Sequence, residues 1–314
     1  MPMRQVTLRQ LRVFETVARN LSHTRAAEEL MLTQPAVSLQ VKQLEEHVGT
    51  ALFEQIGKKL HLTEAGRELY YYIRQITRQL DEAEEALARL KGLESGSLRL
   101  TVVHSAKYFA PKLLGLFKER YGNIRVTLDV ATRDVCLEKL TGNEVDFAIM
   151  SRPPDGSELV AAPLVHNPLA IVASANHALA RARRVAPERL AEETWMLREP
   201  GSGTREVTDD FLQQHGITPA GVMVMSSIEA IKQGVQANLG VAMVPLHAVQ
   251  LELSTGNLAL LDVVGLPIER TWYVVQREGR RLSHAVQAFK DFVLAEGADH
   301  VSIASRPGRV GKTA

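Results

Sequence analysis

Hydroxyl and basic side chains recur where the sequence predicts that a strand ends and a helix begins. Hydroxyl groups and free backbone N–H groups at helix starts donate hydrogen bonds to oxyanions, and Lys or Arg adds positive charge. In open α/β sheets, ligands bind at these carboxyl ends of strands. The sequence therefore predicts a cleft for a small anion with carboxylate or phosphate groups. Its candidate residues are Ser105, Lys107, Arg133, Ser151, Arg152, Ser202, Gly203, Thr204, Arg205 and Ser227.

The sequence gives weaker support to a catalytic or metal site than to this cleft. Gly201-Ser202-Gly203 is not a phosphate-binding Walker A loop, because no Gly-Lys-Ser/Thr follows it, and alone it indicates only a turn. A triad of Ser202, His215 and Asp209 is conceivable, but no G-x-S-x-G turn frames the serine. The histidines lack metal-ligand spacing, and Cys136 is the single cysteine. We expect no enzyme activity, cofactor or metal, and a packing role for Cys136.

A second polar set lies near the N-terminus, on a predicted helix whose other face is apolar. Gln can pair with the adenine edge, and Ser with a base edge or a phosphate. Thr33 and the free N–H groups of the first helical turn can hold a phosphate, and Lys adds sequence-independent contacts. The alternative is a small helical domain with a solvated polar face. The candidate DNA-binding residues are Arg25, Thr33, Gln34, Pro35, Ser38, Gln40, Lys42, Lys58 and Lys59.

Three short helices and a hairpin are predicted to position this set. Apolar residues at helical spacing indicate a first helix from Leu8 to Val17, and Ser22 is a suitable N-cap for a second. Thr33 can cap a third helix that stops near Gly49. Residues 52–62 are typical of two short strands around a Gly-Lys-Lys tip. Residues 1–62 are therefore predicted to form a winged helix-turn-helix domain.

Residues 63–92 are predicted to form a linker helix that dimerises. Their apolar residues alternate steps of three and four for about four heptads, which is typical of a coiled-coil seam. The alternative is a long helix packed on its own domain, which is ranked second because charged residues fill most other faces. The predicted dimerisation residues are Leu69, Ile73, Ile76, Leu80, Ala83, Leu87 and Leu90.

Residues 93–303 alternate strand and helix patterns, which predicts an α/β fold with parallel sheets and helices on both faces. About two hundred residues of this kind suit two lobes better than one sheet. Lobe I is assigned to residues 93–165 and 269–303, and lobe II to residues 166–268. Residues 304–314, rich in Arg, Gly and Lys, are expected to form a flexible tail.

Charge and composition restrict the class of protein. The 37 basic and 36 acidic residues give a net charge of +1, so nucleic-acid binding must come from a local surface. No stretch is long and apolar enough for a membrane span, and the first residues do not resemble a signal peptide. We expect a cytoplasmic protein without membrane contact. A solute-binding protein would explain two lobes but leaves the first ninety residues without a role.

The N-terminal motifs resemble those of LysR-type transcriptional regulators, and the resemblance extends over nearly the whole chain. It implies a winged helix-turn-helix, a linker helix, a two-lobed domain like periplasmic binding proteins, and homodimers or homotetramers that act on promoter DNA with RNA polymerase. Leu39 and Gln55 stand where the family often has Arg, so operator preference is not carried over. The motifs, which lie within residues 7–66, are Thr24-Arg25-Ala26-Ala27, Thr33-Gln34-Pro35-Ala36-Val37-Ser38, Gln43-Leu44-Glu45, Gly49, Leu52-Phe53-Glu54 and Leu62-Thr63-Glu64-Ala65-Gly66.

Within that family, four further strings resemble the CbbR subgroup, activators of the Calvin-cycle (RuBisCO) operon. This resemblance implies an effector that reports carbon or reducing-power status, such as a phosphorylated sugar, phosphoenolpyruvate or NADPH. The predicted cleft for an anion is compatible with all of these compounds and does not select among them. The strings are Lys107-Tyr108-Phe109-Ala110-Pro111-Lys112-Leu113-Leu114, Arg152-Pro153-Pro154, Arg198-Glu199-Pro200-Gly201-Ser202-Gly203-Thr204-Arg205 and Ile231-Lys232-Gln233.

Overall fold

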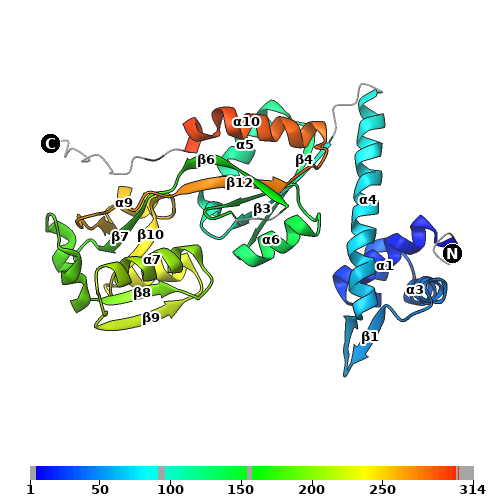
Figure 1. Ribbon diagram of the computed structural model, residues 1–314, viewed down its shortest axis with the longest axis horizontal. Helices are drawn as coiled ribbons and strands as arrows, with labels where there is room; N and C mark the ends of the chain where they lie inside the picture. The colour runs from blue at the N-terminus through cyan, green and yellow to red at the C-terminus, as the bar shows by residue number, and fades with distance from the viewer. Residues whose placement is uncertain (1–4, 91–95, 154–157, 302, 304–314) are drawn as a thin grey trace. The chain divides into compact units, whose positions relative to one another are not determined.

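The computed structural model describes residues 5–90, 96–153, 158–301 and 303 (Figure 1). The chain divides into two compact units: residues 1–93 with 142–144, and residues 94–141 with 145–314. The tail predicted at 304–314 and the last two residues of the predicted linker lie outside the described residues. Among the described helices, none has the length and apolar character needed to cross a membrane.

The first unit begins with three helices whose ends are set by local capping. The Thr7 hydroxyl accepts a hydrogen bond from the Gln10 N–H, and Ser22 and Thr33 cap the next two helices in the same way. Gly49 ends the third helix with a φ of 83°, a conformation that glycine adopts without strain. The caps predicted at Ser22, Thr33 and Gly49 are confirmed. The helices are α1 (Leu8–Asn20), α2 (His23–Leu30) and α3 (Gln34–Val48).

The wing is the antiparallel hairpin of β1 (Phe53–Ile56) and β2 (Lys59–Leu62), as predicted. Glu45 fixes it to α3, because its carboxylate accepts hydrogen bonds from the backbone N–H groups of Leu52 and Phe53 at 2.8 and 3.2 Å. The long helix α4 (Glu64–Leu90) follows at once.

Helix α4 approaches the wing closely at Gly66. A Cβ at Gly66 would overlap the carbonyl oxygen of Leu52, so only glycine fits there. The Thr63 hydroxyl donates to the Ala51 carbonyl at 2.8 Å and accepts from the Gly66 N–H at 3.0 Å. These contacts fix the start of α4 against its own domain.

In the second unit, one five-stranded sheet has the order β4-β3-β5-β12-β6. Strands β3, β4 and β5 are parallel, whereas β12 runs antiparallel to both of its neighbours. We call this sheet lobe I, together with the helices α5, α6 and α10. Its core contains Phe117, Phe147, Trp272 and Phe289, all fully buried. Its elements are β3 (Gly96–Val103), α5 (Ala110–Arg120), β4 (Ile124–Ala131), α6 (Arg133–Thr141), β5 (Phe147–Met150), β6 (Leu159–His166), β12 (Thr271–Arg277) and α10 (His284–Val301).

The remaining strands form a three-stranded sheet, β10-β7-β11, and a parallel pair, β8-β9. We call these strands lobe II, together with α7, α8 and α9. The chain enters it after β6 and returns through β12, and these two strands pair side by side. Trp195 is fully buried in its core. Its elements are β7 (Leu169–Ser174), β8 (Thr194–Arg198), α7 (Gly203–Gln214), β9 (Gly221–Met225), α8 (Ile228–Gln236), β10 (Ala242–Pro245), α9 (Gln250–Ser254) and β11 (Leu258–Leu260).

The two-lobed α/β fold is confirmed, but the prediction of parallel sheets is wrong in part. Strand β7 pairs antiparallel with both β10 and β11, and β12 pairs antiparallel with β5 and β6. The strands that connect the lobes run in opposite directions because the chain leaves lobe I along one and returns along the other. The five-stranded sheet of lobe I is therefore mixed, and the three-stranded sheet of lobe II is antiparallel.

Candidate functional site

Helix α3 presents the polar face that the sequence predicted. Val37 and Leu44 are fully buried and Val41 nearly so, which turns the opposite face of the helix outward. Gln34, Pro35, Leu39 and Lys42 are exposed on that face, and Ser38 and Gln40 are half-buried. The residue types suit the major groove, because an amide can pair with adenine and an exposed leucine can contact a thymine methyl group.

The two central polar groups of this face are already hydrogen-bonded to each other. The Gln34 Nε2 donates to the Ser38 Oγ at 2.9 Å, and Ser38 Oγ lies 3.5 Å from the Nδ1 of His23 on α2. Burial lowers the pKa of His23, with Glu45 opposing the effect. A neutral His23 leaves Ser38 in a network without a fixed charge, which links the first helix of the turn motif to the second.

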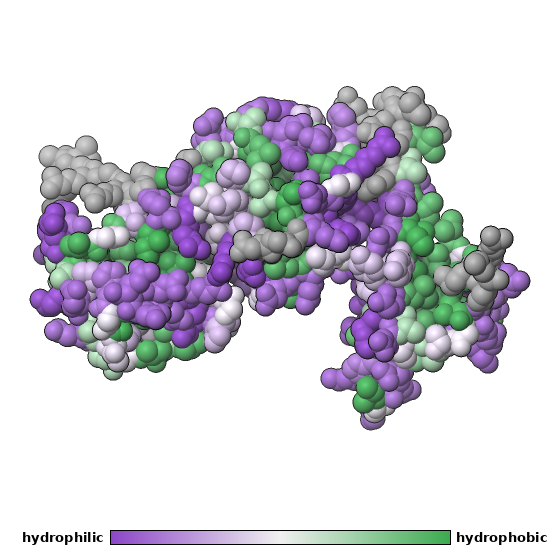
Figure 2. Space-filling model, viewed as in Figure 1, coloured by the Kyte–Doolittle hydropathy of each residue, from purple (hydrophilic) through white to green (hydrophobic). Residues whose placement is uncertain are grey.

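The four basic residues predicted to contact DNA lie on α2, on α3 and at the tip of the wing. Arg25, Lys42, Lys58 and Lys59 are all exposed, as contacts to a phosphate backbone require. The wing tip turns at Gly57, whose φ is 64°. The surface of this part of the molecule is mainly hydrophilic around the wing (Figure 2).

The linker helix corrects one part of the dimerisation set. Ile73 is fully buried and Leu69 is partly buried within the core of the N-terminal domain, so Ile73 is not part of an open seam. The alternative of packing on its own domain therefore holds for the first turns of α4. Farther along, Ile76, Leu80 and Leu87 are 40%, 41% and 60% exposed, and Figure 2 shows hydrophobic side chains along α4. Ala83 is also exposed, and the side chain of Leu90 lies outside the described residues.

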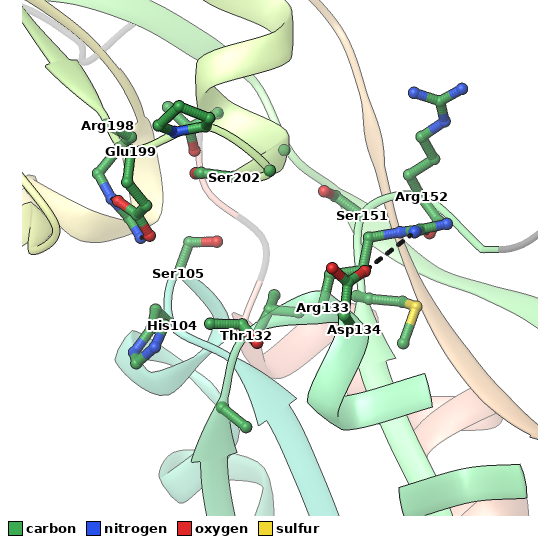
Figure 3. A pocket seen from close by; sticks show the side chains of 17 residues that line it. His104, Ser105, Thr132, Arg133, Asp134, Ser151, Arg152, Arg198, Glu199 and Ser202 are labelled. Atoms are coloured by element: carbon green, nitrogen blue, oxygen red, sulfur yellow. Dashed lines mark hydrogen bonds and ion pairs between the residues drawn. The ribbon is translucent and has the colours of Figure 1, made fainter. Parts of the chain in front are cut away.

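A cleft of about 160 Å³ lies between the carboxyl ends of lobe I strands and the start of α7 in lobe II. Figure 3 shows the hydroxyl groups of Ser105 and Ser151 pointing into it from opposite sides. The lobes come close here, because a Cβ at Gly203 would lie 3.4 Å from Ser151 Oγ. Seven of the ten predicted residues line this cleft: Ser105, Arg133, Ser151, Arg152, Ser202, Gly203 and Thr204.

The N-terminus of α7 is the part of the cleft best suited to an anion. Ser202 occupies the N-cap position, but its side chain makes no capping hydrogen bond. The first N–H groups of the helix therefore keep their donors, and the helix dipole favours negative charge at this end. Ser202 and Thr204 add hydroxyl groups beside them.

Each arginine of the cleft has a carboxylate partner. Arg198, at the end of β8, is buried and donates two hydrogen bonds to Glu199, at 2.7 and 2.6 Å. Arg152 pairs with Glu206 at 2.8 Å, and Arg133 lies 3.8 Å from Asp134. The cleft thus contains balanced charge, and an incoming anion must compete with carboxylates already present.

The pair of Arg198 and Glu199 sets charge states in the cleft. Burial alone would raise the pKa of Glu199, but the hydrogen bonds from Arg198 lower it below its usual value. Burial and the nearby Arg198 guanidinium lower the pKa of His104, which also lines the cleft. Glu199 is therefore ionised and His104 uncharged near neutral pH.

Three predicted cleft residues lie elsewhere, which corrects their assignment. Arg205 braces the end of β8, since its NH1 donates to the Arg198 carbonyl at 2.9 Å while its Nε donates to Asp209. Ser227 caps α8 by accepting from the Glu229 N–H. Lys107 pairs with Glu229 at 3.3 Å.

Sequence reasoning missed His104, Asp134, Arg198 and Glu199 as lining residues. Only Pro200 separates Arg198 and Glu199 from the predicted Gly-Ser-Gly turn, so their position was a usable signal. The pairing of Arg152 with Glu206 joins residues 54 positions apart and left no local pattern.

Two family models match the chain, one over each domain. The model of the LysR substrate binding domain matches residues 91–298, and that of the bacterial regulatory helix-turn-helix protein, lysR family, matches residues 8–67. The chain belongs to the LysR family of transcriptional regulators. It is therefore a DNA-binding regulator rather than an enzyme, with a C-terminal domain for a small molecule.

Individual relatives show which members of the LysR family this protein resembles. It is 49% identical over 293 residues to the RuBisCO operon transcriptional regulator of Allochromatium vinosum, covering 93% of this chain and 97% of the relative. It is 45% identical over 288 residues to the regulator CbbR of Rhodospirillum rubrum, covering 92% and 96%. The predicted resemblance to the CbbR subgroup is confirmed.

Among the solved structures similar to this chain is one of a separate regulatory domain. The regulatory domain of CcmR from Synechocystis PCC6803, in complex with 2-PG, has a TM-score of 0.61 and 34% identity. It covers 66% of this chain and is itself matched over its full length.

Proposed function

We propose that this LysR-family protein regulates a carbon-fixation (RuBisCO) operon in the cytoplasm and responds to a small anionic metabolite. Relatives that are 49% and 45% identical over nearly their full length carry the names of RuBisCO operon and CbbR regulators, which supports the operon. The uncapped start of α7, facing Ser105 and Ser151 across the cleft, is the observation that supports an anion.

The effector would bind with its anionic group at the start of α7. Backbone N–H groups and the hydroxyls of Ser202 and Thr204 would donate to its oxygens from lobe II. Ser105 and Ser151 would donate from lobe I, and Arg133 would add charge. The complex of a related regulatory domain with 2-PG makes 2-PG the first compound to test. Phosphorylated sugars and NADPH are the other candidates of the same anionic class.

The winged domain, residues 1–62, would read promoter DNA. Gln34, Ser38 and Gln40 would contact base edges, while Thr33 and Pro35 would set the first turn of α3 against a phosphate. Arg25, Lys42, Lys58 and Lys59 would hold the backbone, giving binding that weakens with salt.

Residues 63–92 would join two chains through the exposed stripe of Ile76, Leu80, Ala83 and Leu87. A solvent-facing apolar stripe on a helix of 27 residues is what a partner helix would bury. Residues 93–303 would form the effector domain. Homotetramers would then bind paired operator sites and contact RNA polymerase at the promoter.

Binding of effector and operator by the full-length protein tests this proposal. Titration with 2-PG should show saturable binding, and Arg133→Ala should weaken it at least about tenfold, because it removes a charge-assisted contact. Arg183→Ala, which removes an arginine with a 74% exposed side chain from lobe II, is the matched control. Gel retardation with the DNA upstream of the RuBisCO genes should be sequence-specific. If the protein bound no anion, the proposed effector would be contradicted. If unrelated DNA were retarded equally, the proposed operator recognition would be contradicted.

A further inference from the structure

A cluster of charged and aromatic side chains lies outside the effector cleft and joins the two lobes. The Tyr108 hydroxyl, from the short helix η2 (Ala106–Tyr108) of lobe I, donates to Glu229 Oε1 on α8 at 2.6 Å. Lys107 Nζ lies 3.3 Å from the same carboxylate oxygen. Burial, reinforced by the Glu229 carboxylate, raises the pKa of Tyr108, so the hydroxyl stays protonated and donates.

On the lobe II side, Lys232 is the centre of the cluster. Its side chain is only 7% exposed, and its Nζ lies 3.0 Å from Glu229 and 2.8 Å from Glu252. It also donates to the Ala248 carbonyl at 3.1 Å. The Tyr108 ring takes part as well, because the ammonium groups of Lys232 and Lys107 lie 5.0 and 5.2 Å from its centroid.

The lobes differ in what they contribute. The buried lysine and both carboxylates belong to lobe II, where Glu229 and Glu252 satisfy Lys232 without help from lobe I. Lobe I supplies the neutral ring and hydroxyl of Tyr108 and a lysine, Lys107, whose side chain is 33% exposed. Separation of the lobes would therefore strand no buried, unpaired charge, which is the costly event in breaking a buried ion pair. The contact between Tyr108 and Glu229 can open at low cost.

The lobe I half of the cluster is continuous with the effector cleft. Ser105, which lines the cleft, is the N-cap of η2, and Tyr108 is the last residue of that helix. A single helical turn thus joins a cleft hydroxyl to the hydroxyl that binds Glu229. Two of the sequence strings shared with the CbbR subgroup, around Tyr108 and Lys232, meet at this point.

We propose that Tyr108 and Glu229 are positioning residues that form a releasable clamp between the lobes and hold Ser105 opposite the start of α7. The clamp favours the arrangement in which donors of both lobes face one cleft. Opening it depopulates that arrangement and weakens the apparent affinity for an effector by the fraction of chains that remain competent. The effect on affinity rests on the proposed function of the cleft, whereas the clamp itself does not.

The distance between the lobes tests the clamp without any ligand. Spin labels are placed on full-length protein at Lys118→Cys in α5 and Gln213→Cys in α7, both exposed sites, while the native Cys136 is buried. Labelled chains are diluted with unlabelled ones, so that the measured distances are those within one chain. Tyr108→Phe, which keeps the ring and removes the hydroxyl, should broaden the distance distribution. Tyr121→Phe, at the end of α5, removes a hydroxyl from the same lobe and should leave it unchanged. An unchanged distribution in Tyr108→Phe would overturn the proposal.

A titration with 2-PG then measures the consequence for binding. Tyr108→Phe should weaken the affinity between about three- and tenfold, as expected for loss of one hydrogen bond to a carboxylate. In a Glu229→Gln background the same substitution should add little, because both changes remove one shared interaction. Full additivity of the two losses would overturn the pairing. If the unsubstituted protein binds no anion, the proposed effector is wrong, and the label distances still decide the clamp.

Discussion

The Arg152 guanidinium of lobe I donates to the Glu206 carboxylate of lobe II, with NH1 and Oε2 2.8 Å apart. Arg152 follows β5 of lobe I, and Glu206 lies in the first turn of α7 in lobe II. In Figure 3 the Arg152 side chain extends away from the hydroxyls of Ser105 and Ser202. One of the positive charges that line the cleft is therefore already paired with a carboxylate of the opposite lobe.

Substitution of that carboxylate should strengthen effector binding. Glu206→Gln leaves Arg152 without a competing anion, so the affinity for 2-PG should rise between about two- and fivefold, a small effect because the exposed pair is screened by water. Asp209→Asn, on the same helix but paired with Arg205, is the matched control. Calorimetric titration measures both. A lower affinity in Glu206→Gln would show that Glu206 assists the ligand instead of competing with it.

Base-reading and phosphate-binding residues should differ in salt dependence. Gln34→Ala with Ser38→Ala should lower operator affinity by at least about tenfold and leave binding to unrelated DNA unchanged. Lys58→Ala should weaken binding to both DNAs and reduce the slope of log affinity against log salt by about 1. Retardation assays at several salt concentrations measure these slopes. Unchanged operator affinity in the double variant would refute α3 as the reading helix.

Gly66 should not tolerate a side chain. Gly66→Ala forces a methyl group into the Leu52 carbonyl, so the free energy of unfolding of the winged domain should fall by at least about 2 kcal/mol. The control, Gly115→Ala in α5, meets no atom within 4 Å and should be neutral or stabilise by up to about 1 kcal/mol. Denaturant unfolding followed by circular dichroism compares them. Equal stability of the two variants would contradict the close approach of α4 to the wing.

Stability should fall as the solution becomes acidic, in part because of His247. Burial lowers the pKa of His247, which is 7% exposed, and its Nε2 hydrogen bond to the Val301 carbonyl only partly opposes this. Below the unfolded pKa of 6.5, the unfolded chain binds a proton that the folded chain refuses, so acid favours unfolding. The free energy of unfolding that this one histidine removes is at most about 1.4 kcal/mol per pH unit.

Thermal melts between pH 7.5 and 5.5 check this sign. His247→Gln should flatten the pH dependence of the melting temperature, whatever its effect on stability at pH 7.5. His166→Gln, which removes an imidazole with 82% exposure, should leave the slope as it is. A steeper slope in His247→Gln would contradict the assigned neutral state.

Local chemistry made the helix boundaries of the N-terminal domain predictable. Ser22, Thr33 and Gly49 act through hydrogen bonds or dihedral angles within a few residues, so the sequence alone contains the information. The linker helix shows the limit of periodicity. Ile73 fits a heptad pattern, but the same spacing serves packing within one domain and packing between chains. Only the three-dimensional neighbours distinguish them.

The C-terminal domain was predictable in its elements and in most cleft residues, because strand ends followed by hydroxyl groups are visible in sequence. The direction of β12 was not, since a long connection carries no information about which way the chain returns. The carboxylate partner of Arg152 was equally hidden. Glu206 reaches it only because the two lobes fold against each other.

The close contact at Gly66 couples the orientation of α4 to that of the winged domain, including α3. The first turn of α4 cannot slide or roll on the wing, because Leu52 and Thr63 hold it, so α3, β1 and α4 turn as one piece. A helix of 27 residues is about 40 Å long, so a tilt of about 10° at one end moves the other by about 7 Å. Displacements of that size are comparable to the spacing of two base pairs. In the dimer proposed above, a slight reorientation of the two linker helices would thus be enough to change which turns of DNA the two α3 helices can reach together.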